Sequence, residues 1–321
     1  MPRRLVTTLL AVLVSVGCAS STPLGPDRGS SGWHELLTEH VRLQTDLSIT
    51  QARAAAAVLE QLQQAIVTAV WGGIQPSTEP TAVILFLDAD EYGRYAAGPR
   101  SRHWRLGPEA ELVSHGPPER WGLAPSRDVE VAPKEIVAGM VAALDQRAHP
   151  TAPPWFRFGL VSYFSTLELD PASGAVGWGK LHRDLWEAYR SYLSLSLALL
   201  NHWNAGFGEM EPARRGEYEA LSWAAVCWMA NARPKSLHAF QLAFARGASP
   251  QDAWKEALGD RSIPELDAEM RTTMDRGRFA IGEARVPASV AVQNERALTD
   301  EEIARLFFQA GNALGARSPP R

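Results

Sequence analysis

The segment that decides the fold is PWFRFGLVSYF, which occupies residues 154–164. Pro154 opens it directly after Pro153, and proline is favoured at the first position of a helix, where its missing N–H would have no helical partner. The sequence therefore predicts a helix from Pro154 to about Leu169. Its aromatic side chains form a wall for which core packing is the default interpretation and a recognition groove is the alternative. The residues of that candidate groove are Trp155, Phe156 and Tyr163.

Working outward from this segment, the second half of the chain is predicted to be a mainly helical lobe. Pro133 opens a helix to about Arg147, and Ile136, Met140 and Leu144 form an apolar stripe at helical spacing along it. A glycine-rich loop is expected over residues 174–179. Further helices are predicted over residues 181–202, 214–231, 234–246, 250–258 and 263–276.

The first half of the chain indicates a small mixed sheet. Residues 39–45 alternate polar and apolar side chains, which favours a half-buried strand, and residues 81–87 form an apolar run typical of a buried strand. An alanine-rich helix is predicted between them over residues 50–70. A capping box at Thr299–Glu302 begins a last helix. We therefore expect an α+β fold, with a small N-terminal mixed sheet and its helices packed against the helical C-terminal lobe.

The first residues resemble the leader of a bacterial lipoprotein. Arg3 and Arg4 precede an uncharged, mostly apolar run of residues 5–16, which ends at Gly17-Cys18. This run has the length of a secretory core and is too short to span a bilayer. In that family the cysteine is acylated, although a leucine usually stands where this chain has Ser15. An ordinary signal peptide or a twin-arginine signal are the alternatives. The expectation is a lipid-anchored envelope protein, sent to the outer membrane if the cell is diderm.

Charge and cysteine content limit the partners and the redox chemistry. Removing Arg3 and Arg4 with the leader changes the formal net charge from −4 to −6, which argues against nucleic acid as a partner. Cys227 would then be the single free cysteine, so we expect no internal disulfide. It lies in an apolar helix-like run, where a buried, unreactive thiol is favoured over a nucleophile.

Three segments resemble the peptidase MA-like domains of the gluzincin clan, the zinc peptidases related to thermolysin. The residues 154–164 are similar to the family's P-x-W-F-x-E-G-L-A-x-Y-F segment, and Gly247–Gly259 is similar to a stretch that recurs near its C-terminus. The third segment comprises Glu39-His40-Val41, a helix and the strand ending at Asp88. The resemblance implies an N-terminal sheet beside a helical lobe and covers roughly residues 33–278.

Active gluzincins hold zinc with the two histidines of H-E-x-x-H and a glutamate of the second segment, and the resemblance places these ligands on residues of this chain. Lys134 and Ala138 stand at the histidine positions, and Phe158 stands at the position of the third ligand. Glu135 occupies the position of the general base, where a helix N-terminal role is the simpler interpretation. Because alanine and phenylalanine carry no donor atom, we expect no zinc and no other cofactor.

The sequence leads to a division of the chain and to three hypotheses for its function. The divisions are a signal peptide (1–17), a flexible tether (18–32), an inactive peptidase MA-like domain (33–278) and a C-terminal extension with one helix (279–321). The leading hypothesis is a non-catalytic envelope protein that binds a peptide or protein partner. One alternative is a hydrolase or peptidase that uses an unusual metal site or non-metal residues. The other is a purely structural tether in the envelope.

Overall fold

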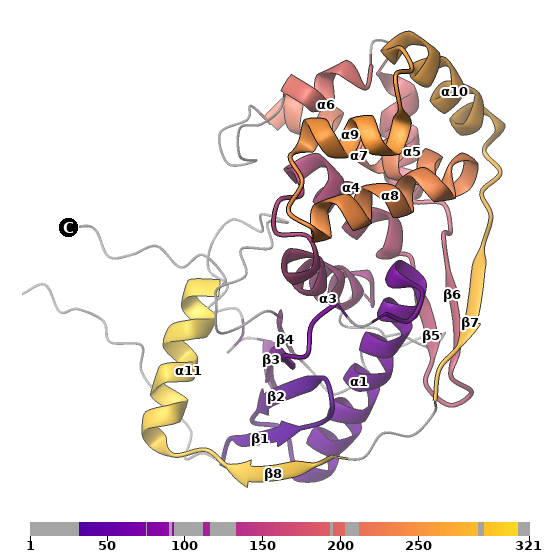
Figure 1. Cartoon of the computed structure of the whole chain (residues 1–321). Coiled ribbons are helices and arrows are strands. Elements are labelled where there is room, and N and C mark those ends of the chain that lie inside the picture. Colours follow the sequence, from indigo (N-terminus) through magenta and orange to yellow (C-terminus); the bar gives the residue numbers. More distant parts are fainter. Residues whose placement is uncertain are drawn as a thin grey trace, which may run out of the picture.

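A computed structural model of the chain describes residues 32–74, 76–89, 92, 112–115, 133–192, 195–202, 212–287 and 292–313. These ranges hold ten helices and eight strands, so the molecule is of mixed α and β structure (Figure 1). The predicted leader, Cys18 and nearly all of the predicted tether lie outside the described residues. No helix in the described ranges is long and apolar enough to cross a membrane.

The N-terminal sheet has five strands in the order β4-β3-β2-β1-β8. The strands β2, β3 and β4 run parallel to one another, whereas β1 is antiparallel to both of its neighbours, β2 and β8. The sheet is therefore mixed, as the sequence predicted. The strand bounds are β1 His34–Leu37, β2 Val41–Thr45, β3 Thr81–Phe86, β4 Leu112–His115 and β8 Asn294–Ala297.

Helices cover both faces of this sheet. The helix α1 (Ile49–Trp71) packs on β1 and β2, and α11 (Asp300–Ala313) lies on the opposite side of the sheet (Figure 1). Every residue of β3 is buried. Val83 and Leu85 belong to the main core, whereas Ile84 and Phe86 join a second core with residues of α11. Successive side chains of a strand point to opposite faces, so the continuous apolar run of β3 follows from burial on both sides.

A second, three-stranded sheet lies beside α1 in Figure 1 and was not predicted. It pairs β5 (Glu168–Asp170), β6 (Ala175–Trp178) and β7 (Gly282–Arg285), all antiparallel. The predicted loop over residues 174–179 is therefore wrong in part. At Gly174 the backbone has a φ of +68°, and a Cβ there would come 2.1 Å from the carbonyl oxygen of Val286. Only glycine permits this close approach, which places the turn between β5 and β6 against Val286, the residue that follows β7.

The predicted helices are confirmed with two corrections. The helix that begins at Pro154 ends at Phe164, not near Leu169, because the chain turns there into β5. The helix expected over residues 181–202 is two separate helices. The bounds are α3 Pro133–Ala148, α4 Pro154–Phe164, α5 Arg183–Ser191, α6 Ala198–His202, α7 Pro212–Ala232, α8 Pro234–Ala245, α9 Pro250–Leu258 and α10 Ile263–Arg276.

Residues of the predicted C-terminal extension are built into both sheets. The strand β7 completes the second sheet, and β8 is the edge strand of the first. The capping box of α11 is present: the Thr299 N–H donates to Glu302 at 2.9 Å, and the Glu302 N–H donates to the Thr299 hydroxyl at 3.3 Å. The Phe307 ring of α11 lies 5.5 Å from the ring of Trp33. The two ends of the described chain therefore share one apolar cluster.

Candidate functional site

The positions expected to hold zinc ligands lie on α3 and α4, two helices that pack against each other. Lys134 and Glu135 are exposed in the first turn of α3, Ala138 is buried one turn later, and Phe158 on α4 is half-buried. Alanine and phenylalanine have no donor atom, and a lysine ammonium binds a metal only after losing its proton. As they stand, these three side chains supply no zinc ligand set.

The Glu135 carboxylate acts electrostatically on Tyr92. Burial is the main reason that the pKa of Tyr92 is raised above its ordinary value, and the negative charge of Glu135 adds to that shift. Tyr92 in turn packs on Phe86, with 6.2 Å between the ring centroids. The negative charge of the candidate general base therefore acts on a tyrosine that packs against the second core.

Gly159 fixes the position of α4. A Cβ at this position would come 2.3 Å from the Ser222 carbonyl oxygen and 2.6 Å from the Val226 Cγ2 on α7. Two helices can approach so closely only where one of them has no side chain. The glycine that follows Phe158 is thus explained by packing between α4 and α7.

The three aromatic residues of the candidate groove are buried in the core, so none of them lines an open groove. Trp155 is 3% exposed, Phe156 is 0% and Tyr163 is 5%. Trp155 meets Phe240 edge-on at 5.8 Å, and Phe156 meets Phe244 at 5.0 Å. The rings of α4 therefore fill the space between α4 and α8, where their burial removes apolar surface from water.

A buried polar network joins the end of α3 to the start of α4. Asp145 and His149 are each 1% exposed, and the His149 Nδ1 lies 2.6 Å from the Asp145 Oδ1. The Arg157 Nη1 lies 3.6 Å from the other oxygen of Asp145, and the Arg157 Nε donates to the Ala152 carbonyl at 3.0 Å. The network ties the turn between the two helices to α4. Sequence reasoning missed it, although an Asp and a His four residues apart at the end of a helix with an apolar middle were a visible signal.

Within the described ranges, Glu39, His40 and Glu60 form the one group of side chains whose ligand atoms lie close enough to share a metal ion. Glu60 is fully buried and accepts hydrogen bonds from the Thr38 hydroxyl at 2.6 Å and the His40 N–H at 2.9 Å. Its other oxygen lies 2.6 Å from the His40 Nδ1, and the His40 Nε2 lies 3.8 Å from the Glu39 carboxylate. Because Glu60 is buried and already bonded to Thr38 and His40, the accessible side of this group is formed by the exposed Glu39 and the half-buried His40.

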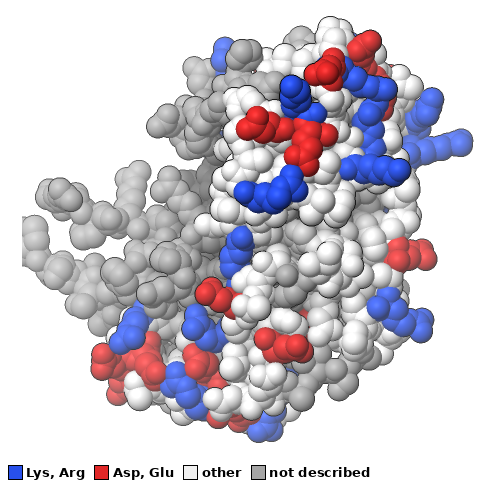
Figure 2. Space-filling view, in the orientation of Figure 1, with Lys and Arg blue, Asp and Glu red and all other residues white. Residues whose placement is uncertain are grey.

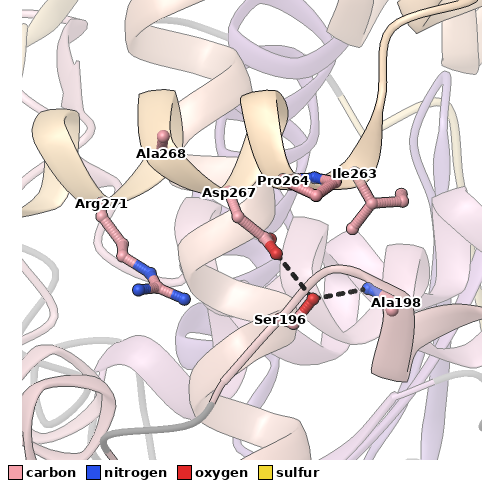
Figure 3. A pocket seen from close by; sticks show the side chains of 7 residues that line it. All are labelled: Ser196, Ala198, Ile263, Pro264, Asp267, Ala268 and Arg271. Carbon is pink, nitrogen blue, oxygen red and sulfur yellow. Dashed lines mark hydrogen bonds between the residues drawn. The ribbon is translucent and has the colours of Figure 1, made fainter.

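A cavity of about 500 Å³ lies between α10 and the loop that precedes α6 (Figure 3). Asp267 of α10 accepts hydrogen bonds from the Ser196 hydroxyl at 2.6 Å and from the Leu197 N–H at 2.8 Å. These bonds explain why the predicted helix over residues 181–202 is interrupted. The residues that line the cavity are Ser196, Ala198, Ile263, Pro264, Asp267, Ala268 and Arg271.

Arg271 brings a positive charge to the same cavity. Within the described part of the chain its guanidinium forms no ion pair. Burial raises the pKa of Tyr189 to about 12, and the Arg271 charge acts against that rise, which indicates that the tyrosine lies near the guanidinium. No local pattern in the sequence indicated this cavity, because Ser196 and Asp267 are 71 residues apart.

A function for this chain has to be inferred from the residues and contacts described above. Neither the models of known protein families nor the curated proteins give a match to this chain.

Proposed function

We propose that the chain is a lipid-anchored, non-catalytic envelope protein with a degenerate zinc-peptidase fold that holds a peptide or protein partner. The observation that supports it best is the chemistry of Ala138 and Phe158. The resemblance assigns them to two ligand positions, they lie on adjacent helices, and neither side chain can donate an electron pair to a metal. Glu135 would then lack a metal-activated water to deprotonate.

The first experiment measures zinc and peptidase activity in the purified protein. We expect far less than one zinc per chain and no peptidase activity that a chelator removes. The matched variant restores the ligands with Lys134→His, Ala138→His and Phe158→Glu. Zinc should raise the melting temperature of this triple variant, because a metal that binds the folded state alone stabilises it.

The control is the double variant Lys134→His with Ala138→His, which lacks the third ligand and should respond less to zinc. Stoichiometric zinc in the unmodified protein, together with chelator-sensitive activity, would contradict the proposal. A triple variant that is indifferent to zinc would contradict the placement of the ligand positions.

The anchoring part of the proposal rests on the Arg pair, the apolar run and the Gly17-Cys18 junction. Mass spectrometry of the membrane fraction should find an acylated N-terminal Cys18. A Cys18→Ala variant should leave that fraction, because more than one acyl chain is needed for stable attachment and the variant would carry none. A soluble mature protein that begins at another residue would contradict the anchor.

The second candidate function is a hydrolase with an unusual metal site, and the group of Glu39, His40 and Glu60 is the observation that favours it. A buried carboxyl on one ring nitrogen is the usual support for a histidine that binds metal through the other. His40→Ala should then abolish any metal-dependent hydrolysis. Loss of activity in that variant, with activity present in the unmodified protein, would favour the enzyme over the binding protein.

A further inference from the structure

The cavity beside α10 presents two opposite charges that do not neutralise each other. Asp267 and Arg271 are four residues apart on one helix, so their Cβ atoms lie about 5–6 Å apart on the same face. Such a pair ordinarily forms an ion pair. Here both oxygens of Asp267 are instead engaged by Ser196 and Leu197, and Arg271 is left without an acidic partner among the described residues.

The Asp267 side chain is held rigidly at the wall of the cavity. The residue is 7% exposed, and its two hydrogen bonds fix it to the loop before α6. The Ser196 hydroxyl that donates to it also accepts from the Ala198 N–H at 3.2 Å, so the loop and the carboxylate order each other (Figure 3). Each carboxylate oxygen carries two lone pairs, so one on each remains for a further donor.

Among the described residues, the other side chains that line the cavity are apolar. Ile263 and Pro264 from the first turn of α10, with Ala198 and Ala268, offer aliphatic surface next to the two charged groups. A volume of about 500 Å³ falls within the range of sites for small molecules. The face of the molecule shown in Figure 2 carries both basic and acidic side chains, and neither sign covers it as a whole.

The charges restrict the class of ligand. A simple anion would gain from the Arg271 guanidinium, but it would face the carboxylate of Asp267 in the same cavity. A simple cation would gain from the Asp267 carboxylate, but it would face the guanidinium of Arg271. A molecule with one carboxylate and one ammonium close together satisfies both groups, and an aliphatic substituent would contact Ile263 and Pro264.

We propose that this cavity binds a small zwitterion of the α-amino-acid type. Its carboxylate is held by Arg271, its ammonium faces Asp267, and its aliphatic side chain packs on Ile263 and Pro264. A guanidinium binds a carboxylate through two parallel hydrogen bonds, which gives this contact its orientation. The site is independent of the proposed peptidase-like positions on α3 and α4, and neither proposal requires the other.

The test is calorimetric titration of the full chain with L-leucine at concentrations up to about 10 mM, which covers weak binding. Two related compounds each lack one charge: isocaproate has no ammonium, and isoamylamine has no carboxylate. We expect saturable binding of leucine and at least about tenfold weaker binding of either compound, as loss of one charged hydrogen-bonding group requires.

Two variants locate the site. Arg271→Gln should weaken leucine binding about tenfold or more, since it removes a charge-assisted contact. The matched control is Arg276→Gln, an exposed arginine of the same helix that does not line the cavity, and it should bind as the unmodified protein does. Ala268 is exposed and lines the cavity, so the Ala268→Phe variant should fold and its ring should block the binding of leucine.

Three outcomes would overturn the proposal. They are the absence of leucine binding at the highest concentration, equal binding of leucine and isocaproate or isoamylamine, and equal binding by the Arg271→Gln and Arg276→Gln variants.

Discussion

At the scale of single residues, the packing of two helices explains a glycine in the segment that resembles the zinc peptidases. Gly159 stands beside Phe158, in the segment on which the resemblance depends most. Its lack of a side chain allows α4 and α7 to touch. The glycine in this segment is thus explained by packing, with no need of a metal site.

Gly159→Ala should therefore destabilise the protein. The new Cβ would lie 2.3 Å from the Ser222 carbonyl oxygen, so one helix must move. We expect a loss of about 1–3 kcal/mol or more in the free energy of unfolding, measured by urea denaturation. Gly177→Ala is the matched control, because nothing lies within 4 Å of a Cβ there. Equal stability of the two variants would contradict the close contact.

The Cys227 thiol should be unreactive in the folded protein. It is 1% exposed, and burial raises its pKa well above the ordinary value, so the thiol stays protonated at neutral pH. Labelling with a thiol reagent, read at Cys227 by peptide mass spectrometry, should be slow before unfolding and complete after it. Rapid labelling of the folded chain would show that this part of α7 opens.

At the scale of elements, α11 is held by its capping box and by its apolar face. Ile303, Leu306 and Phe307 bury that face against Trp33, Ile84 and Phe86. The helix start is fixed by Thr299 and Glu302, and the Arg296 side chain of β8 bonds the same glutamate. The helix therefore depends on both local and long-range contacts.

Glu302 should make the stability of α11 depend on pH. The hydrogen bond from Arg296, followed by that from the Thr299 N–H, lowers the Glu302 pKa from 4.5 to about 2. A lowered pKa in the folded state stabilises it above the ordinary pKa of 4.5, and that contribution is lost as the pH falls towards 2.

The measurement is urea unfolding of the unmodified protein and Glu302→Gln across this pH range. The stability difference between them should shrink as the pH falls. Glu301→Gln, on the exposed side of the same turn, should show a smaller change. A difference that stays constant down to the lowest pH would rule out the role of Glu302.

Phe307→Ala should cost about 3–5 kcal/mol, as expected for a buried phenylalanine, because it leaves a cavity between α11 and the sheet. Phe307 is 1% exposed and lies against Trp33 and Phe86. Ile281→Ala is a suitable control, since Ile281 is 56% exposed and should change stability by less than about 0.5 kcal/mol. Denaturant midpoints compare the two, and a Phe307→Ala loss as small as that of the control would contradict the packing of α11.

At the scale of the whole molecule, the C-terminal residues connect the two sheets. The chain passes through β7 in one sheet and β8 in the other before it forms α11. The face of the N-terminal sheet opposite α1 is covered by α11, so the protein needs its C-terminal helix to bury that face.

Deleting residues 299–321 should leave β8 in place and uncover Trp33, Ile84 and Phe86. We expect a lower melting temperature and increased binding of a hydrophobic dye, because apolar area is returned to water. Differential scanning calorimetry and dye fluorescence measure these effects. A truncated chain that melts as the full chain does would show that α11 is not needed to cover the sheet.

The sequence by itself determined the features that depend on neighbours within about four residues. Ser249 caps α9, Thr299 and Glu302 form the predicted box, and the helices that begin at Pro133 and Pro154 start where expected. An N-cap or a helical stripe is complete within one or two turns, so its signal is visible in the chain. That the helices beginning at Pro133 and Pro154 lie next to each other was instead an expectation from the family resemblance, and α3 does pack against α4.

Only the tertiary structure decided which distant segments meet. It pairs β6 with β7, joins Asp267 to Ser196 across 71 residues, brings Glu60 to His40, and buries the rings of α4 that the sequence had offered as a groove. A three-residue strand has almost no local signal, and its stability comes from the partner strand. Burial likewise depends on how the whole chain packs. The same aromatic residue can therefore lie in a core or line a groove, according to which distant segments pack against it.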